Sequence, residues 1–372
     1  MKIGVPAEIR AGETRVAAIP ETVKKLAARN EVGVQAGAGV KSSIPDREFQ
    51  AAGAKIVGTA AQAYDADIVL KVRAPEEGEL GMLRSGSTLI GLLNPFDAAA
   101  LGTLAKRGVN GFAMEWLPRI SRAQSMDVLS SQANIAGYKA VVLAMAEYGK
   151  FFPMLMTAAG TVKAARVLVL GAGVAGLQAI ATAKRMGAMI EASDVRPAVK
   201  EQIESLGAKF VDVPYETDEE RSIAQGVGGY ARPMPESWMK RQAQAVHQRA
   251  AQADVVITTA LIPGSPAPKL IREDTIKAMK PGSVIVDLAV EQGGNVEGIE
   301  LGRIVFKHEV KLIGIPNLPA TVAADASALL ARNLFNFLAL MLDAKSGEFK
   351  INREDEVVAG ALVCAGGEVV KK

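Results

Sequence analysis

Residues 166–194 read RVLVLGAGVAGLQAIATAKRMGAMIEASD: an apolar run, a glycine-rich turn, a helical pattern and a second apolar run that ends in an acid. Gly171 allows a sharp turn, Gly173 allows the backbone to approach a pyrophosphate, and Gly176 allows the helix to pack closely on the strand. The N-terminus of such a helix directs N–H groups and partial positive charge toward phosphates. The stretch therefore predicts a Rossmann-type nucleotide-binding unit.

The acid that ends this stretch favours one nicotinamide nucleotide over the other. Asp194 lies 18 residues after Gly176, where a carboxylate accepts hydrogen bonds from the adenosine ribose hydroxyls. Because a carboxylate repels a 2′-phosphate, we expect NAD(H) to bind in preference to NADP(H), although Arg196 nearby weakens this preference. The alternative is a structural glycine turn in a doubly wound fold that has lost its ligand.

Strand and helix patterns alternate on both sides of this unit. Short apolar runs separated by stretches of helical spacing are typical of parallel sheets covered by helices. The sequence therefore predicts an α/β fold with two Rossmann-like, doubly wound parallel-sheet domains. The apolar runs lie at 2–5, 32–37, 67–72, 87–93 and 110–115 in the first domain, and at 167–170, 209–213, 254–260, 283–290 and 311–315 in the second.

Two long helical patterns, at 126–148 and 320–343, indicate how the domains are connected. The first pattern would leave the N-terminal domain and the second would return to it, which makes the second domain an insertion. We therefore expect a discontinuous N-terminal domain of residues 1–127 and 318–372. The NAD(H)-binding domain is expected at 128–317, joined to the first by the long helices.

The segment 214–235 breaks the alternation, because it runs about twenty residues without apolar periodicity where connections usually take about 2–6. One interpretation is a disordered surface insertion. The other is a mobile lid, in which glycines act as hinges and Tyr230 covers a ligand. The candidate hinges are Gly226, Gly228 and Gly229.

Composition excludes several classes of function. A net charge of +3 over 372 residues, without a block of Lys and Arg, argues against a nucleic-acid partner. The single cysteine, Cys364, excludes a disulfide framework and a four-cysteine zinc site and is typical of a reducing cytosol. We see no signal peptide and predict no metal site. Polar side chains interrupt residues 326–343, which therefore predict a buried helix rather than a membrane span.

A proton carrier is hard to find in this sequence. A dehydrogenase acting on an alcohol or amine must move a proton, most often with His or Lys. His247 and His308 are the only histidines, and their surroundings predict structural roles on a surface helix and at a strand edge or turn. Lys71, at the end of a predicted strand, is a better candidate, although it could equally be a surface charge.

Hydride transfer between two nicotinamide rings would need no such group, because no proton changes hands. Such a site needs only positioning and charge complementarity, which Gln, Arg and Asp supply. Residues 118–127, PRISRAQSMD, have this composition, with Arg119, Gln124 and Asp127 as candidate catalytic residues. The alternative is a capped helix start, with Ser125 or Asp127 as the cap and solvated arginines at 119 and 122.

The chain resembles the NAD(H)-binding domain I of proton-translocating NAD(P)+ transhydrogenase, in the form where this domain is a separate soluble alpha subunit of the alpha-1 type. The resemblance covers essentially the whole chain. The arginine–glutamine–aspartate segment and the GGYA lid are specific to that family, whereas the glycine turn is not. The matching motifs include PRISRAQSMDVLSSQANIAGY, MLMTAAGTV, GAGVAGLQAIATAKRMGA, SDVR, GGYA, ITTALIPG, MKPGSVIVDLAVEQGGN and NLPA.

The resemblance implies a role for each candidate residue. Arg119, Gln124 and Asp127 would form the loop beside the nicotinamide, and Ser130 would help to hold its amide. Gln124 would bridge toward the nicotinamide of NADP. Tyr230, with Gly229, would belong to a lid that closes over bound nucleotide. The other implied NAD(H) contacts are Ile120, Ser121, Ser125, Met126, Gly171, Gly173, Val174, Gly176, Asp194, Val195, Arg196, Gln242 and Leu261.

The resemblance also implies partners. A domain III would supply NADP(H), and membrane subunits would couple hydride transfer to proton translocation. The chain would be a homodimer in the cytoplasm, associated with the membrane only through those subunits. All of these expectations come from the resemblance and none from composition or spacing.

Alanine dehydrogenase is a related family with the same two-domain plan, and an enzyme of that type is the alternative function. It shares the RVA start containing Arg15 and the strand carrying Lys71. Its strand-end histidine would fall at Asn94, and asparagine cannot carry the proton that oxidative deamination requires. Ala7 is a second departure, because related N-termini usually have lysine there. A third, non-enzymatic interpretation is an NAD-sensing module with an inactive site.

Overall fold

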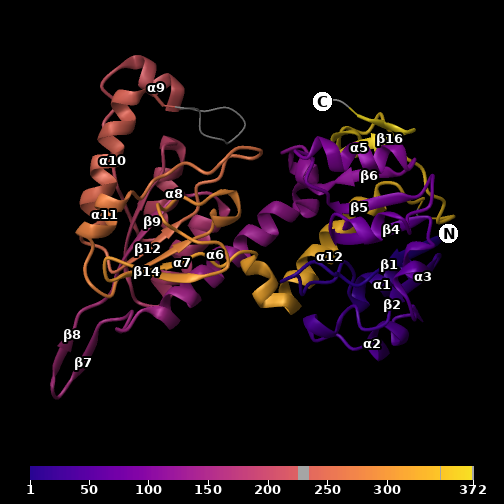
Figure 1. The fold of residues 1–372 in the computed structure, drawn as a ribbon, viewed down its shortest axis with the longest axis horizontal. Coiled ribbons are helices and arrows are strands. Elements are labelled where there is room, and N and C mark those ends of the chain that lie inside the picture. The colour runs from indigo at the N-terminus through magenta and orange to yellow at the C-terminus, as the bar shows by residue number, and fades with distance from the viewer. Residues whose placement is uncertain (225–233, 344, 371–372) are drawn as a thin grey trace. The chain divides into compact units, whose positions relative to one another are not determined.

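The computed structural model describes residues 1–224, 234–343 and 345–370. Contacts divide the chain into two compact units (Figure 1): unit 1 is Met1–Gln132 with Pro319–Lys372, and unit 2 is Ala133–Leu318. The predicted boundaries at 127 and 317 therefore shift by a few residues. The first boundary moves because α6 (Val128–Glu147) begins in unit 1, where Val128 is fully buried in the core.

Unit 1 contains an eight-stranded sheet in the order β17-β16-β6-β5-β4-β1-β2-β3. Strands β1 to β6 are parallel, and the strand order reverses between β1 and β4. The antiparallel edge strands β16 and β17 were not predicted. The bounds are β1 Lys2–Val5, β2 Glu31–Gln35, β3 Lys55–Val57, β4 Ile68–Arg73, β5 Thr88–Leu92, β6 Asn110–Ala113, β16 Leu362–Ala365 and β17 Glu368–Val369.

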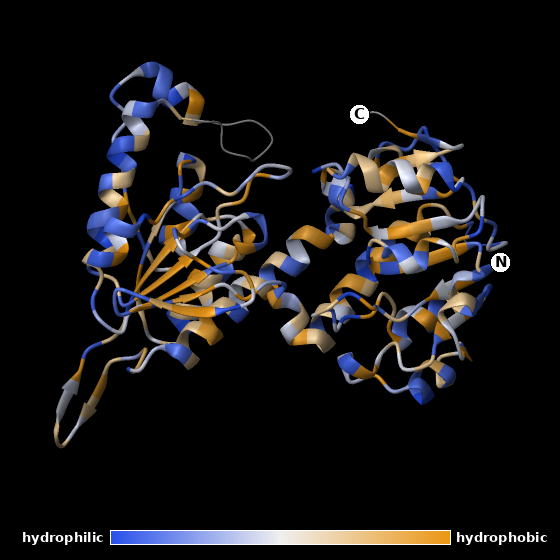
Figure 2. Ribbon diagram, viewed as in Figure 1, coloured by the Kyte–Doolittle hydropathy of each residue, from blue (hydrophilic) through white to orange (hydrophobic). Residues whose placement is uncertain are grey.

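Unit 2 contains a seven-stranded sheet in the order β11-β10-β9-β12-β13-β15-β14, with only the edge strand β14 antiparallel. Its central strands are almost continuously apolar (Figure 2), as strands covered on both faces must be. A separate hairpin, β7–β8, follows α6. The bounds are β7 Leu155–Thr157, β8 Gly160–Val162, β9 Arg166–Leu170, β10 Met189–Ser193, β11 Lys209–Phe210, β12 Val255–Thr258, β13 Val284–Asp287, β14 Ile304–Lys307 and β15 Val310–Ile313.

Two helices of unit 1 begin at residues that are typical of a helix N-terminus. Pro20 opens α1 at its first turn, and Asp97 accepts a hydrogen bond from the Ala100 N–H at the start of α5. Among the described residues, no helix combines the length and apolar character needed to cross a bilayer. The bounds are α1 Pro20–Ala27, α2 Asp46–Ala51, α3 Ala60–Tyr64, α4 Glu77–Leu80, α5 Ala98–Lys106, α7 Val174–Arg185, α8 Lys200–Ser205, α9 Asp218–Ala224, α10 Glu236–Ala250, α11 Glu273–Ala278, α12 Ala323–Ala339 and α13 Glu356–Ala361.

The segment 214–235 is only partly irregular. Residues 218–224 form α9, because the buried Glu220 carboxylate accepts hydrogen bonds from Arg241 of α10 at 2.7 and 2.8 Å. This ordered stretch was not predicted. The proposed hinges and cover, Gly226, Gly228, Gly229 and Tyr230, lie outside the described residues.

Candidate functional site

The glycine turn lies at the carboxyl end of β9, next to β12, where the strand order of the second sheet reverses. Open α/β sheets bind ligands in the crevice outside such a switch point. The turn leads directly into α7, with Gly173 as the residue that precedes its first helical position. The predicted strand–turn–helix order is therefore present in the structure.

Each glycine of the turn has a different steric role. Gly171 has a φ of 96°, and a Cβ at this position would lie 2.6 Å from Thr259 Oγ1. A Cβ on Gly176 would lie 1.9 Å from the Gly171 carbonyl oxygen, so only glycine allows α7 to approach the turn this closely. A Cβ on Gly173 would have no neighbour within 4 Å. The space above Gly173 is therefore open, as a pyrophosphate at this helix N-terminus requires.

Asp194, the first residue after β10, is packed against this turn. Its carboxylate accepts the backbone N–H of Ala172 at 2.7 Å and is itself only 6% exposed. The guanidinium of Arg196 folds back and donates to both carboxylate oxygens at 2.9 Å. This ion pair raises the pKa of Arg196. A ribose that binds Asp194 would therefore share the carboxylate with, or displace, Arg196.

An aromatic pair supports the segment that follows Asp194. The Tyr215 hydroxyl donates to the Val195 carbonyl at 3.3 Å, and the Tyr215 ring stacks on Trp238 with centroids 6.0 Å apart. Gln242, one turn along α10 from Trp238, is buried. Neither Tyr215 nor Trp238 was predicted as a site residue, because stacking between residues 215 and 238 does not affect the local periodicity of the sequence.

A buried polar pair shapes the loop that carries Leu261. Asp287 accepts three backbone N–H groups, and burial raises the pKa of its carboxyl group. One of those donors, Asn295, in turn binds both the N–H and the carbonyl of Ala260. Leu261 follows directly and is 41% exposed, so its side chain is available at this edge of the sheet.

The polar segment 118–127 belongs to unit 1. Residues Ser121–Met126 form a short 3-10 helix, called η3 below, and α6 begins two residues later. Arg119, Ser121, Gln124 and Ser125 are exposed, and Ile120 is partly buried. Met126 is only 5% exposed, and its side chain packs in the core of unit 1.

Asp127 and Ser130, both predicted to act near the nicotinamide, contact each other. The Asp127 carboxylate accepts the Ser130 N–H at 2.9 Å and the Ser130 hydroxyl at 2.6 Å. This is the capping contact that the alternative interpretation predicted, because the carboxylate satisfies a free N–H of the first turn of α6. The same interpretation predicted a solvated Arg122; its side chain is 48% exposed, and it also forms a two-point ion pair with Asp355.

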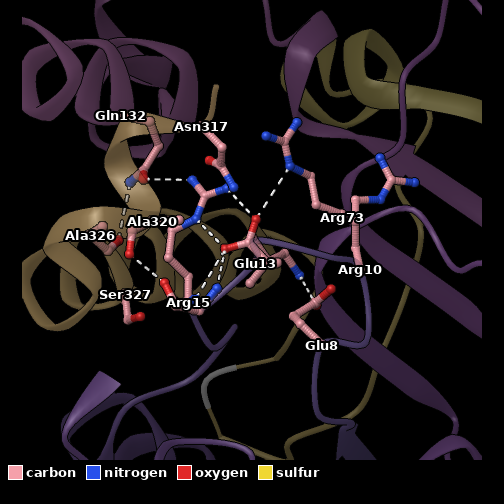
Figure 3. Close-up of polar contacts among 12 residues, drawn as sticks. Glu8, Arg10, Glu13, Arg15, Arg73, Gln132, Asn317, Ala320, Ala326 and Ser327 are labelled. Atoms are coloured by element: carbon pink, nitrogen blue, oxygen red, sulfur yellow. Dashed lines mark hydrogen bonds and ion pairs between the residues drawn. The ribbon is translucent and has the colours of Figure 1, made fainter. Parts of the chain in front are cut away.

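Figure 3 shows a buried polar network around Arg15 in unit 1. Arg15 is 2% exposed and makes a two-point ion pair with Glu13 at 2.7 and 2.8 Å. It also donates to Gln132 Oε1 at 2.8 Å, which ties the loop after β1 to the first turns of α6. Glu13, Arg15 and Gln132 all belong to unit 1, so these contacts join two segments of that unit.

Lys71 is not a surface charge, so that interpretation was wrong. Its side chain is 1% exposed, and its ammonium group lies 2.8 Å from Glu79 Oε1 and 3.3 Å from Glu8 Oε2. The Tyr64 hydroxyl donates to the same Glu79 oxygen at 2.9 Å. Burial raises the pKa of Glu8. An ammonium enclosed by two carboxylates is poorly placed to exchange protons with a substrate.

Structural contacts also hold the two histidines and Asn94, the residue at the position of the expected histidine. His247 Nδ1 lies 2.9 Å from Thr275 Oγ1, and His308, in the turn between β14 and β15, lies 3.0 Å from Glu273. Asn94, just beyond β5, has a φ of 52°, and its N–H donates to Glu115 at 2.8 Å. Among the described residues, no group of His, Cys, Asp and Glu could hold a metal ion.

Comparison with known proteins agrees with this geometry. Family models described as "Alanine dehydrogenase/PNT, N-terminal domain" and "Alanine dehydrogenase/PNT, C-terminal domain" match residues 4–136 and 140–372. The chain belongs to the alanine dehydrogenase/PNT family. Membership of this family accounts for the two Rossmann-like units and for the glycine turn in the second of them.

Within the alanine dehydrogenase/PNT family the chain is closer to the transhydrogenases. It is 53% identical to the first part of the alpha subunit of NAD(P) transhydrogenase from Rhodospirillum rubrum, over 100% of this chain and 98% of that protein. It is 32% identical to alanine dehydrogenase of Mycobacterium tuberculosis, over 92% of this chain and 88% of that protein. The structure of transhydrogenase from Sinorhizobium meliloti matches with a TM-score of 0.89 at 48% identity, covering 100% of both chains. The resemblance to transhydrogenase and the predicted α/β fold are confirmed.

Proposed function

We propose that this chain is the NAD(H)-binding subunit of a proton-translocating transhydrogenase, in which hydride passes directly between NAD(H) on this chain and NADP(H) on a partner subunit. The observation that carries the proposal is the open space at Gly173, at the N-terminus of α7, with Asp194 packed beside the same turn. These groups fit the pyrophosphate and the adenosine ribose of a dinucleotide. When bound, the nicotinamide supplies the hydride donor or acceptor.

The chain's own residues would bind and orient the nucleotide rather than move protons. Gly171, Gly173, Val174 and Gly176 would hold the pyrophosphate through backbone and shape. Asp194, Val195 and Arg196 would contact the adenosine ribose, and Gln242 and Leu261 would complete the pocket, together with Gly229 and Tyr230. Arg119, Gln124, Asp127 and Ser130 would serve the nicotinamide, with Ile120, Ser121, Ser125 and Met126 shaping their segment.

The absence of a free proton carrier among the described candidates supports transfer between two nicotinamides. Asn94 stands where the alanine dehydrogenases would have a histidine, and its backbone is held by Glu115. Lys71 is enclosed by carboxylates, and both histidines have structural partners. Transfer from one pyridine ring to another requires positioning and charge complementarity only.

The proposal includes partners. A subunit that carries NADP(H), and membrane subunits that translocate protons, would complete the enzyme, and this chain would lie at the cytoplasmic face of the membrane through them. A homodimer is also proposed. Met156 in hairpin β7–β8 is 78% exposed, and Met154, just before it, is 58% exposed; an isolated hairpin is marginally stable in water at best. A second copy that covers these methionines would stabilise the hairpin.

The test is reconstitution of the chain with membrane and NADP(H)-binding subunits. The purified chain should bind NADH more tightly than NADPH, and the assembled enzyme should transfer hydride between NADH and an oxidised NADP analogue. Rapid reductive amination of pyruvate by the chain alone would instead show an alanine dehydrogenase. NADH binding without hydride transfer in the assembly would indicate a sensor.

A further inference from the structure

Helix α12 holds the backbone of η3 through two asparagine side chains. Asn333 Nδ2 donates to the Ser125 carbonyl oxygen at 2.8 Å, and Asn336 Nδ2 donates to the same oxygen at 3.0 Å. A carbonyl oxygen has two lone pairs, so the two amides saturate it. The peptide that follows Ser125 is therefore oriented by residues 208 and 211 positions further along the chain.

The amide of Asn333 is itself held by a chain of hydrogen bonds that starts at the buried Glu13–Arg15 ion pair. Arg15 donates to Gln132 Oε1 at 2.8 Å, and Gln132 Nε2 donates to Ser131 Oγ at 3.3 Å. Ser131 Oγ donates to Asn333 Oδ1 at 2.8 Å. Because Oδ1 of Asn333 accepts from a hydroxyl, the other end of its amide is left to donate to Ser125.

A third anchor lies on the other side of Gln124. Arg122 donates to both carboxylate oxygens of Asp355, at 2.8 and 2.5 Å. Asp355 also accepts the N–H groups of Val357 and Val358 at the start of α13, so its carboxylate is fixed before it meets Arg122. The backbone on both sides of Gln124 is thus attached to the C-terminal segment of unit 1.

The side chain of Gln124 is exposed, like those of Ser121 and Ser125. Within the described residues, no hydrogen bond engages its amide. An exposed amide on a fixed backbone is what positioning of a reactive ring requires, since rates fall steeply when reacting atoms are misplaced. We propose that Asn333 and Asn336 are positioning residues for hydride transfer, which they support by orienting the backbone that carries Gln124. This inference rests on the function proposed above.

The test compares isosteric aspartate variants in the enzyme assembled with its membrane and NADP(H)-binding subunits. Asn333→Asp keeps the acceptor for Ser131 but removes the donor to Ser125, and Asn336→Asp removes the second donor. Each should slow single-turnover hydride transfer from NADH to an oxidised NADP analogue by about 10- to 100-fold at saturating nucleotide. The dissociation constant for NADH should change by less than about threefold, because both amides donate to the Ser125 carbonyl within unit 1.

Two further variants separate positioning from stability. Arg332→Ala, on the same helix, removes an exposed ion pair with Glu21 and should leave the transfer rate unchanged. Asn336→Gln keeps an amide donor and should retain most of the rate. A thermal melt of each variant checks folding, and Asn336 is the safer site because it is only partly buried.

The outcomes are distinct. If the aspartate variants lower the melting temperature or weaken NADH binding while the transfer rate of the bound complex stays at the wild-type value, the asparagines are merely structural and the inference is overturned. Wild-type enzyme that transfers no hydride would instead overturn the proposed function. Slow transfer in both aspartate variants, with recovery in Asn336→Gln, supports positioning.

Discussion

Under the proposed function, charge at single residues would decide which nucleotide the second unit accepts. Asp194 places a nearly buried carboxylate beside the glycine turn, and Arg196 lies directly on it. The carboxylate repels a 2′-phosphate, whereas the guanidinium would attract one. The proposed preference for NAD(H) would therefore depend on Arg196 remaining paired with Asp194.

Substitution of Asp194 tests this balance. Asp194→Ala releases Arg196 and removes the repulsion, so we expect the preference for NADH over NADPH to fall by about tenfold or more, or about 1.4 kcal/mol. Asp194→Asn is the matched control for geometry, because it keeps an acceptor for the Ala172 N–H while removing the charge. Titration of each variant with both nucleotides measures the effect, and an unchanged preference in Asp194→Ala would remove the ribose role.

Gln124 tests the catalytic part of the proposal. Gln124→Asn keeps the amide but shortens the side chain by one methylene, so hydride transfer should slow by about 100-fold because the contact with the ring is lost. NADH affinity should stay nearly constant, as the pyrophosphate and ribose contacts lie elsewhere in the chain. Stopped-flow transfer and equilibrium binding measure the two effects separately. A large loss of NADH binding would show that Gln124 has a different role.

At the scale of elements, the strand–turn–helix unit can be tested with two glycines. Gly176→Ala places a Cβ against the Gly171 carbonyl, so α7 must shift, and we expect a loss of about 1–3 kcal/mol in unfolding free energy. Gly173→Ala meets no neighbour, so its melting temperature should stay close to that of the wild type.

The same pair separates folding from ligand binding. The Gly173→Ala methyl group would occupy the space proposed for the pyrophosphate, so NADH binding should weaken by about tenfold or more in a protein that folds normally. Calorimetry and NADH titration give the two quantities. Tight NADH binding by Gly173→Ala would mean that the phosphates do not lie at this turn.

The anchor between η3 and α13 predicts a dependence on pH. The Arg122 guanidinium lowers the pKa of Asp355 from 3.8 to about 2. The folded pKa is below the unfolded one, so the pair contributes stability above about pH 4 and loses it as the pH falls toward 2. The stability difference between wild type and Asp355→Asn should be present at pH 6 and shrink between pH 4 and pH 2. If the stability difference between the wild type and Asp355→Asn stays constant from pH 6 to pH 2, the ion pair contributes nothing to folding stability.

At the scale of the whole molecule, the exposed hairpin predicts self-association. Met156→Asp places a charge on the most exposed methionine of β7–β8 and should shift a homodimer toward monomer, because a buried charge without a partner is costly at an interface. Sedimentation velocity over a concentration series measures the shift. Phe306→Asp, on the exposed edge strand β14, is a control for the effect of an added charge elsewhere on unit 2. If both variants have the same dimer content as the wild type, the hairpin is not the dimer interface.

The features of the site that the sequence predicted depend mostly on residues close together in the chain. The glycine turn can be predicted from residues 171–176, because the close approach of Gly176 to the Gly171 carbonyl lies within the same strand–turn–helix unit. The parallel strands follow from short apolar runs, and Asp127 was foreseen as a helix cap from its place before an apolar helix. The spacing between Gly176 and Asp194 is likewise fixed by one helix and one strand.

Sequence patterns were enough to predict the two α/β units, the glycine turn, the acid beside it and the relation to transhydrogenases, because these depend on contacts between residues close in sequence or on short motifs. The folded chain was needed to show that Lys71 is enclosed by Glu8 and Glu79, that Arg122 binds a carboxylate 233 residues away, and that two asparagines of α12 hold the Ser125 carbonyl. Such contacts join segments far apart along the chain. Local periodicity does not predict these contacts, because each of the side chains, taken alone, is equally compatible with exposure to solvent.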